Sequence, residues 1–492
     1  GNGGANGDLF TVKSESVPVG DDAAEVSFVT QQGTILPDLT IGAELDSAKP
    51  LMANEGLSNP GVKLHGAGFI ISREKAKNLG LGEITGLEQH IRPYRNGRDL
   101  TDKPRYALVI DLFGLTAKQV FDNYPAVYQH VIENVKPERD QNNRAGYRTN
   151  WWIHGEPRKE LRRQISGLRR FIATVETAKY RTFQFLDKSV LPDNKLVCIA
   201  IAAAAQLCVL SSHIHSCWAL RAGSILGPTP VYVKTTCFET FPFPTLASPI
   251  QGDGEQPNKT LVEKLRSLGE QLDAHRKRQQ AAHVGLTLTG MYNVLEKLKS
   301  AEPLTDKEKI IHEQGLVSVL KSLHDEIDLA VLEAYGWGDL AGLMQVVNGN
   351  AQNDGQNRSD AIRQLDETLL ERLVALNKDR ATEEARGLIR YLRPEFQNPA
   401  LATAMPKQAE MDVESDDDAP AAKPLAKEKI AWPKTLPEQV RAVLDVLKTE
   451  GAHSSPELAS RFKGVKAPKL GELLQTLVDM GRVRETNKGF SV

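Results

Sequence analysis

The chain has 492 residues, of which 40% are hydrophobic and 25% charged, and its formal net charge is −2. This composition predicts a globular protein of several domains and excludes a disordered or collagen-like chain. The 4 cysteines are too few and too widely spaced for a disulfide scaffold or a zinc site. We therefore expect a reducing, cytoplasmic setting.

The first segment, residues 1–36, is rich in glycine and then weakly strand-like at Glu25–Thr30. No basic stretch followed by an apolar run, the pattern of a secretory signal, stands at the start. The segment begins without methionine and reads like a loop entered midway. We interpret it as a connector from a missing upstream part of a larger protein.

The next region mixes strand and helix signals, which predicts an α+β fold. Ala107–Phe113 is a short β-branched run that predicts a buried strand, and Thr116 is expected to start a helix. Further strand-like pieces stand at Thr182–Leu186 and Pro230–Lys234. The Trp151–Trp152 pair is predicted to belong to the core, because neighbouring tryptophans rarely both face water.

A basic patch lies between Lys136 and Lys188, with 13 Lys or Arg residues against 6 Asp or Glu. Within it, Pro157 is expected to open one long amphipathic helix that runs to Val175. Its apolar stripe is Leu161, Ile165, Leu168, Ile172 and Val175. Its opposite face carries Arg162, Arg163, Arg169 and Arg170. Such a face can displace counterions from phosphates.

The stretch Ser211–Pro244 combines histidines, a tryptophan, basic residues and a closing Phe-Pro-Phe-Pro. Aromatic and basic side chains that alternate on ordered elements are typical of nucleic-acid-binding surfaces. The apolar run before it, Leu196–Leu210, is too short and too rich in alanine to span a bilayer. It predicts a buried core helix, and we expect no membrane partner.

From about Pro257 to Gln397 the pattern becomes helical. Leu261, Leu265, Leu268 and Leu272 form one stripe, and Thr305 with Glu308 is a capping box that predicts a long helix to Tyr335. Ser359–Tyr391 predicts a further helix. These stripes are typical of the core of a helical bundle.

The last part of the chain has two sections. Residues 406–430 carry 6 acidic residues between Glu410 and Asp418, with alanine, proline and lysine around them, which predicts a disordered linker. Residues 431–492 predict three helices and a hairpin with its turn at Asn487–Gly489. That combination indicates a small winged-helix domain, which could contact DNA or a partner protein.

No catalytic, cofactor or metal site is visible in the sequence. The glycines of His65–Phe69 lack the spacing of a nucleotide-binding loop, and neither Asn-Pro step continues into the Pro-aromatic pair of a base-modifying methyltransferase. His324 with Asp328 is read as a solvated pair on one helix face rather than a metal site. Ser211 and Ser212 beside His213 lack an orienting acid.

Several motifs taken together resemble one family. They are IRPYRNGRDL (91–100), VIDLFG (109–114), the tryptophan pair, SSHIHSCWA (211–219), ETFPFP (239–244), the helical stretch 272–337 and LIRYLRPEFQNP (388–399). They resemble the part that follows the catalytic core in large bacterial adenine-specific DNA methyltransferases, the MmeI-like restriction-modification group. The resemblance runs from about Pro37 to Pro399.

The resemblance implies how the chain is divided. Residues 1–36 would connect from a missing upstream catalytic domain, 37–250 would form the target-recognition domain, and 251–405 a helical domain. The upstream methyltransferase domain or subunit would bind S-adenosylmethionine and the flipped adenine, so this chain itself would hold no cofactor. The expected partner is double-stranded DNA. His213 and the strand Val231–Lys234 depart from the family pattern, which puts any inherited sequence preference in doubt.

The candidate DNA-binding residues are of three kinds. The resemblance singles out residues of the 91–100 motif, namely Arg92, Tyr94, Arg95 and Arg98. The expected phosphate-binding residues are Arg139, Arg144, Arg148, Arg162 and Arg163. The candidates for reading base edges are Lys179, Arg181, His213, His215, Arg221, Tyr232 and Lys234.

Two alternatives remain. The chain could be a complete methyltransferase whose cofactor site is not recognised. It could also be a scaffold whose helical bundle and winged helix bind partner proteins without DNA specificity.

Overall fold

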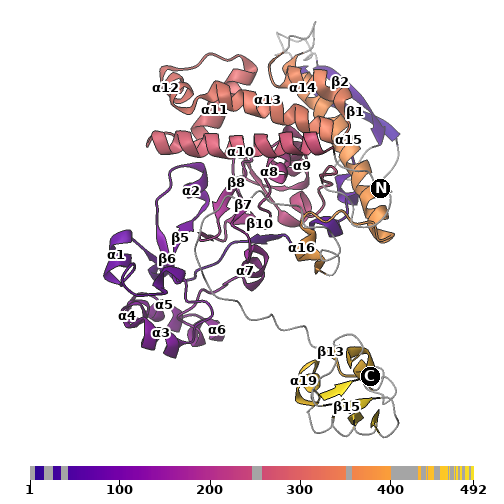
Figure 1. The fold of residues 1–492 in the computed structure, drawn as a ribbon. Coiled ribbons are helices and arrows are strands. Elements are labelled where there is room, and N and C mark those ends of the chain that lie inside the picture. The colour runs from indigo at the N-terminus through magenta and orange to yellow at the C-terminus, as the bar shows by residue number, and fades with distance from the viewer. Residues whose placement is uncertain are drawn as a thin grey trace. The chain divides into compact units, whose positions relative to one another are not determined.

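A computed structural model describes residues 6–15, 26–34, 43–246, 258–350 and 357–399, and short stretches between 430 and 491 (Figure 1). The chain forms two compact units, Gly1–Pro406 and Lys407–Val492. The first unit combines two four-stranded sheets with many helices, which confirms the expected α+β fold class. The linker predicted at 406–430 lies outside the described residues, apart from Ile430.

A small lobe of the first unit is built on one four-stranded sheet in the order β4-β6-β5-β9. Its strands are β4 (Ile70–Ile71), β5 (Ile91–Arg95), β6 (Leu108–Ile110) and β9 (Leu191–Pro192). Its helices are α1 (Arg73–Asn78), α2 (Gly97–Thr101), α3 (Ala117–Asn123), α4 (Pro125–Asn134), α5 (Lys136–Asp140) and α6 (Ala145–Thr149). The predicted strand at Ala107–Phe113 and the Thr116 cap of α3 are both confirmed.

The tryptophan pair belongs to this lobe. Trp151 and Trp152 are partly buried and pack against the lobe's core cluster. The Trp152 indole N–H donates a hydrogen bond of 2.8 Å to the Leu115 carbonyl oxygen. The expectation that the pair belongs to the core is therefore confirmed.

The second sheet has the order β3-β10-β7-β8 and is antiparallel throughout. Its strands are β3 (Ser58–Pro60), β7 (Arg170–Val175), β8 (Gln184–Asp187) and β10 (Leu196–Ile199). Around it lie α7 (Lys159–Ile165), α8 (Ala204–Leu210), α9 (His213–Ala222), the hairpin β11 (Ser224–Leu226) with β12 (Thr229–Val231), and the π-helix η5 (Lys234–Phe238).

Two predicted helices are correct in only one part of their length, and the other part of each is a strand. The expected helix from Pro157 to Val175 ends at Ile165, and Ile172 and Val175 lie in strand β7. Gly167 takes a φ of 81° between the two elements, so the chain turns there instead of continuing the helix. The run Leu196–Leu210 is likewise a buried strand, β10, followed by the helix α8.

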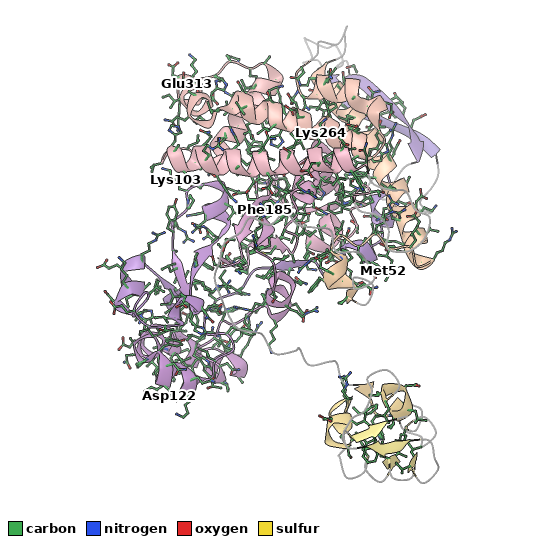
Figure 2. All side chains as sticks on the ribbon, viewed as in Figure 1. Met52, Lys103, Asp122, Phe185, Lys264 and Glu313 are labelled. Atoms are coloured by element: carbon green, nitrogen blue, oxygen red, sulfur yellow. The ribbon has the colours of Figure 1, made fainter. Side chains whose placement is uncertain are left out.

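The helical region covers the second sheet. It consists of α10 (Lys259–Ala282), α11 (Leu288–Ser300), α12 (Asp306–Gly315), α13 (Val317–Ala334), α14 (Ala341–Val347), α15 (Arg358–Ala385) and α16 (Pro394–Gln397). Helix α10 packs on α8 and α13. Side chains fill the space between α10 and the sheet, where Phe185 of β8 lies (Figure 2).

The leucine stripe of α10 is buried, as predicted, at Leu261, Leu265, Leu268 and Leu272. The Thr305–Glu308 capping box is also present. The helix that it opens is shorter than expected, because Leu316 takes a left-handed conformation (φ 42°) between α12 and α13.

The last part of the helical region contacts residues near position 52, at the beginning of the first unit's core. The Glu384 carboxylate on α15 accepts hydrogen bonds from the backbone N–H groups of Met52 (2.7 Å) and Ala53 (2.9 Å). The Arg393 guanidinium donates to the carbonyl oxygens of Gln164 and Ala200. These long-range bonds join the helices and the strands into one unit. No described helix is long and apolar enough to cross a membrane.

Two smaller pieces complete the chain. Strands β1 (Asn6–Glu15) and β2 (Val26–Thr34) pair antiparallel near the N-terminus, where we had expected a connector with strand character only in its second half. In the second unit, β13 (Ile430–Ala431) pairs with β14 (Phe462–Lys463), and β15 (Arg484–Thr486) pairs with β16 (Gly489–Ser491). Helix α19 (Ser455–Ser460) precedes β14. The winged-helix assignment stays a prediction.

Candidate nucleic-acid interface

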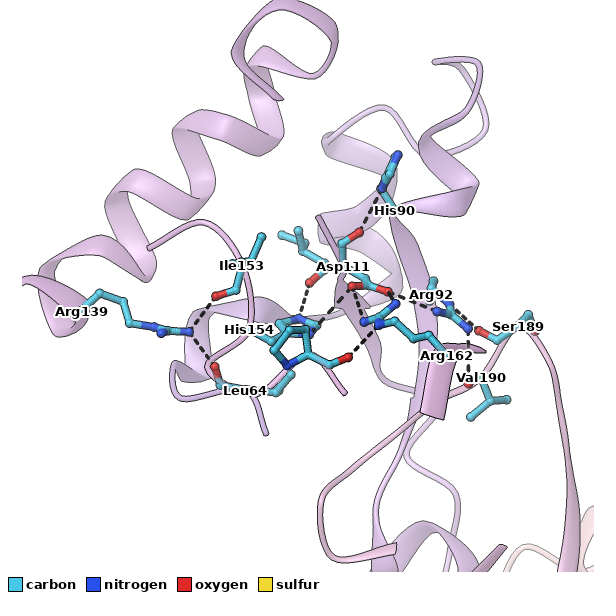
Figure 3. A network of polar contacts seen from close by, with 12 residues as sticks. Leu64, His90, Arg92, Asp111, Arg139, Ile153, His154, Arg162, Ser189 and Val190 are labelled. Carbon is cyan, nitrogen blue, oxygen red and sulfur yellow. Dashed lines mark hydrogen bonds and ion pairs between the residues drawn. The ribbon is translucent and has the colours of Figure 1, made fainter. Parts of the chain in front are cut away.

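Asp111, at the end of β6, holds two of the arginines that we had assigned to DNA (Figure 3). The Arg162 guanidinium donates hydrogen bonds of 2.8 Å to both carboxylate oxygens, and Arg92 donates a third of 3.2 Å. Arg92 also donates to the carbonyl oxygens of Lys188 and Ser189. The phosphate role of Arg162 and the DNA-binding role of Arg92 are therefore corrected, because both guanidinium groups neutralise a buried carboxylate inside the protein.

The charge of Asp111 is fixed by these contacts. Burial alone would raise the pKa of its carboxyl, but Arg162, with His154 and Arg92, lowers that pKa to about 2. Beside it, the ring of His154 bonds through Nε2 to the Ile110 carbonyl oxygen at 2.8 Å, and burial lowers the pKa of this imidazole to about 4. The network joins the small lobe to α7 and is structural.

Arg139 lies inside the small lobe and is 1% exposed. Its guanidinium donates to the carbonyl oxygens of Leu64 (2.8 Å) and Ile153 (2.9 Å), and it lies between the rings of Phe69 and Tyr147. The predicted phosphate contact of Arg139 is wrong, because the side chain does not reach the surface. Instead, these two hydrogen bonds hold Leu64 next to Ile153, which directly follows the tryptophan pair.

Three predicted DNA-binding rings are also buried. Tyr94 is 3% exposed, and its hydroxyl donates to the Asp193 carboxylate at 2.5 Å. His215 and Tyr232 are 0% and 1% exposed and bond to each other at 3.0 Å within a cluster of aromatic side chains. Burial lowers the pKa of His215 to about 3, so the imidazole is neutral. These three assignments are corrected to core residues.

Six of the predicted residues remain exposed. They are Arg98, Arg144, Arg148, Arg163, Lys179 and Arg221. Arg144 and Arg148 lie at α6, where Arg144 contacts the Tyr147 ring. Arg163 pairs with Glu160 at 2.9 Å on the surface of α7. Such exposed pairs contribute little to stability, so these cations can exchange their partners for phosphates.

Lys179, Arg181 and His213 line one hollow of about 320 Å³, which lies between the 179–181 segment and helices α9, α11 and α13. Lys299 and the hydroxyls of Ser211 and Tyr292 also face it. The Ser211 hydroxyl is buried and has no hydrogen-bond partner within the described part of the chain. His213 pairs with the Asp366 carboxylate at 2.7 Å. The hollow therefore combines hydrogen-bond donors and three basic side chains with the carboxylates of Glu296 and Asp328.

Two of the residues proposed to read base edges are held by other partners. The Arg181 guanidinium donates to the Thr174 hydroxyl and the Val175 carbonyl oxygen, and burial lowers its pKa. Lys234 pairs with Glu239 at 2.6 Å. Each of these cations would have to exchange a contact within the protein for one with a base.

Two residues next to Arg95, Arg73 and Tyr106, were not predicted from the sequence. The guanidinium groups of Arg95 and Arg73 lie 5.3 Å and 5.5 Å from the centre of the Tyr106 ring, which is 53% exposed. Arg-Tyr directly before the β6 strand, in KPRYALVI, was the available signal. Nothing in the sequence indicated that Arg73 lies beside this tyrosine.

The exposed cations that were expected to form one nucleic-acid-binding surface therefore lie in separate groups. One group surrounds Tyr106 and one lies on α6, both in the small lobe. The third lines the hollow beside the second sheet.

No group of three or more His, Cys, Asp or Glu side chains among the described residues is arranged to hold a metal ion. Asp328 accepts hydrogen bonds from the His213 backbone N–H and the Asn348 side chain, so it is an internal acceptor rather than the solvated residue we expected. The four cysteines are buried and free. Burial raises the pKa of the Cys198 and Cys208 thiols, which keeps them protonated.

Comparison with protein families identifies a match within the first unit. Residues 47–245 match the family model described as MmeI, target recognition domain. The match covers both sheets, the Asp111 network, the Tyr106 group and the residues of the hollow that lie on α9 and on the 179–181 segment. It confirms the resemblance for the motifs that lie between residues 47 and 245.

One solved structure to which the chain shows similarity is the MmeI restriction-modification enzyme, described as "Type IIL" and solved in complex with DNA. The identity is 15% and the TM-score 0.49, with 72% of this chain covered. This chain spans 40% of the length of that enzyme chain. No curated protein sequence matches.

The segment that matches this family model thus extends from the first 3-10 turns to the Phe-Pro-Phe-Pro segment. Phe241 and Phe243 of that segment are buried, as is Phe238 just before it, and Phe243 packs edge-to-face on both Phe238 and Phe241. The closing motif is therefore core, and it ends the domain where the helical region begins.

Proposed function

We propose that this chain binds duplex DNA and recognises a specific target sequence for a restriction-modification or phage-defence system. The observation that carries the proposal is the match of residues 47–245 to the MmeI target recognition domain. The exposed arginines of the small lobe and the donor-lined hollow support it, because target recognition needs both phosphate contacts and base contacts.

We divide the remaining candidates between these two tasks. Arg98, Arg144, Arg148 and Arg163 are the proposed phosphate contacts, since their side chains are exposed. Lys179 and His213 at the hollow, with Arg181, Arg221 and Lys234, are the proposed base contacts. Phosphate contacts supply affinity on every sequence, whereas base contacts discriminate between sequences.

We further propose that methyl transfer to adenine N6 is performed by a methyltransferase domain or subunit that works with this chain in the bacterial cytoplasm. S-adenosylmethionine would bind there. The glycines of His65–Phe69 do not fit a cofactor loop, because they lead through a 3-10 turn into the two-residue strand β4 and not into a helix. No step of methyl transfer is therefore assigned to residues of this chain.

Fluorescence anisotropy with a labelled duplex of random sequence tests the proposal. We expect log K to fall linearly with log salt by about 0.9 for each phosphate contact, so these four arginines contribute about −3.6 to the slope. A flat titration at low salt would rule out DNA binding and favour the protein-scaffold alternative. Calorimetry with S-adenosylmethionine distinguishes our proposal from the complete-enzyme alternative. We expect no heat of binding from this chain alone, whereas a complete methyltransferase would bind the cofactor.

A further inference from the structure

The register of the small-lobe sheet brings three residues of different motifs together. Leu108 of β6 pairs with Ile71 of β4 on one side and with Pro93 of β5 on the other. Arg73, Tyr106 and Arg95 each lie two residues from Ile71, Leu108 and Pro93 respectively. Because the strands are antiparallel, all three lie at the same end of the sheet. We call these three residues the Arg-Tyr-Arg cluster.

The cluster presents an aromatic ring to solvent with two guanidinium groups over it. The Arg73 and Arg95 guanidinium carbons lie 5.5 Å and 5.3 Å from the Tyr106 ring centre. Within the described part of the chain, neither arginine forms an ion pair with a carboxylate; Arg95 donates only to the Tyr94 carbonyl oxygen. Two uncompensated positive charges held at one ring therefore form a site for an anion.

The backbone at Tyr106 is held in an unfavourable conformation. Its φ is 54°, in the left-handed region that residues other than glycine, asparagine and aspartate rarely adopt. The ring itself is 53% exposed, so burial of the ring does not compensate for this strain. Strained backbone that displays an exposed side chain is frequent at binding sites.

The preceding residue shows how the loop is fixed. The buried carboxylate of Asp99 accepts hydrogen bonds from the Arg105 backbone N–H (2.8 Å) and from its guanidinium (3.0 Å and 2.8 Å). Asp99 also accepts from the Asn96 backbone N–H in the capping box of α2. On the other side, the Ala107 carbonyl oxygen accepts from the Tyr94 N–H at 2.9 Å. Tyr106 is thus displayed between two anchored residues.

We propose that the Arg-Tyr-Arg cluster grips the sugar-phosphate backbone of duplex DNA. Arg73 and Arg95 bind phosphate oxygens, and the Tyr106 ring packs against the adjoining deoxyribose. A guanidinium that lies over a ring keeps its N–H edges free in its own plane, which suits bonding to phosphate. The inference rests on the proposed DNA-binding function and names a contact within it that is independent of base sequence.

The backbone strain gives a test that separates binding from folding. In Tyr106→Asn, the new residue tolerates the left-handed conformation, so we expect the midpoint of thermal unfolding not to fall. DNA affinity should nevertheless weaken about tenfold, by the same factor for a random duplex and for a selected target duplex. The matched control is Ala301→Asn, at φ 57° after α11, which should leave DNA affinity unchanged.

The charge of the cluster is tested with Arg73→Gln. We expect the slope of log K against log salt to become shallower by about 0.9, since one phosphate contact is lost. Unchanged affinity and slope in Tyr106→Asn and Arg73→Gln, with wild-type DNA binding intact, would overturn the cluster's role and leave the proposed function standing. A loss confined to the target duplex, or a loss that follows a lower unfolding midpoint, would also overturn it. Absence of DNA binding by the unaltered chain would overturn both proposals.

Discussion

The Arg162 guanidinium meets the Asp111 carboxylate through two parallel hydrogen bonds of 2.8 Å and connects α7 to the last residues of the β6 segment. The Asp111 side chain is 3% exposed and that of Arg162 16%. A bidentate pair at this depth depends on both partners, because removing one leaves the other charged and buried.

We predict that Asp111→Ala lowers the free energy of unfolding by about 3–5 kcal/mol, since the charges of Arg162 and Arg92 lose their shared acceptor. Urea denaturation of the whole chain measures this change. The control is Arg163→Ala, one residue along the same helix, whose pair with Glu160 is exposed and should contribute little. Equal effects of the two substitutions would show that the Asp111 network does not hold the lobes.

We predict that acid destabilises the protein through His154. Its pKa is lowered by burial to about 4 in the folded protein, so below about pH 6.5 the unfolded chain takes up a proton that the folded chain does not. Stability is therefore lost as pH falls from about 6.5 to about 4, by about 2 kcal/mol at pH 5.

The measurement compares urea unfolding at pH 7.5 and pH 5 in the wild-type protein and in His154→Gln. The substitution should reduce the difference between the two pH values by about 2 kcal/mol, whatever it does to stability at pH 7.5. An undiminished difference would mean that His154 is protonated in the folded protein.

We predict opposite effects for two helical glycines. A Cβ added at Gly269 on α10 would lie 2.1 Å from the Ala204 carbonyl oxygen, so Gly269→Ala should force α10 away from α8 and destabilise by about 1–3 kcal/mol. At Gly342 on α14 a Cβ would meet nothing within 4 Å. Gly342→Ala should therefore stabilise by about 0.5–1 kcal/mol. The midpoint of thermal unfolding of both variants tests the close packing of α10 on α8. A Gly269→Ala protein as stable as the wild type would contradict that packing.

Much of the fold could be predicted from local sequence. The helix start at Thr116, the capping box at Thr305 and the leucine stripe of α10 depend on residues close together in sequence, and all three were predicted correctly. The long arginine helix was wrong because Ile172 and Val175 have a spacing that also fits strand β7. Spacing alone cannot show that the chain turns at Gly167.

The site was harder to predict, because its polar residues find partners far away in sequence. Arginine is usually a surface residue, yet Arg139 is buried, and its acceptor Leu64 lies 75 residues away in the sequence. His215 and Tyr232 are similarly enclosed by aromatic rings. Tyr106 was missed because its neighbours Arg73 and Arg95 are brought to it by the register of three strands.

We predict that Lys179 and Arg144 affect DNA binding differently. Lys179→Ala, at the hollow, should cost about 1–3 kcal/mol on a selected target duplex and little on other sequences. Arg144→Ala, on the exposed surface beside α6, should weaken binding to all duplexes alike and reduce the salt slope by about 0.9. Paired anisotropy titrations on target and scrambled duplexes measure both. If Lys179→Ala instead weakens binding equally to target and scrambled duplexes, Lys179 contacts a phosphate and not a base.

The central claim, recognition of a DNA target, is tested most directly by selecting bound duplexes from a random library and measuring the affinity for the enriched sequence. We predict one recurrent motif, bound at physiological salt at least about 10³-fold more tightly than a scrambled duplex of the same composition. Recovery of no common motif, or equal affinity for the recovered and scrambled duplexes, would contradict the assignment.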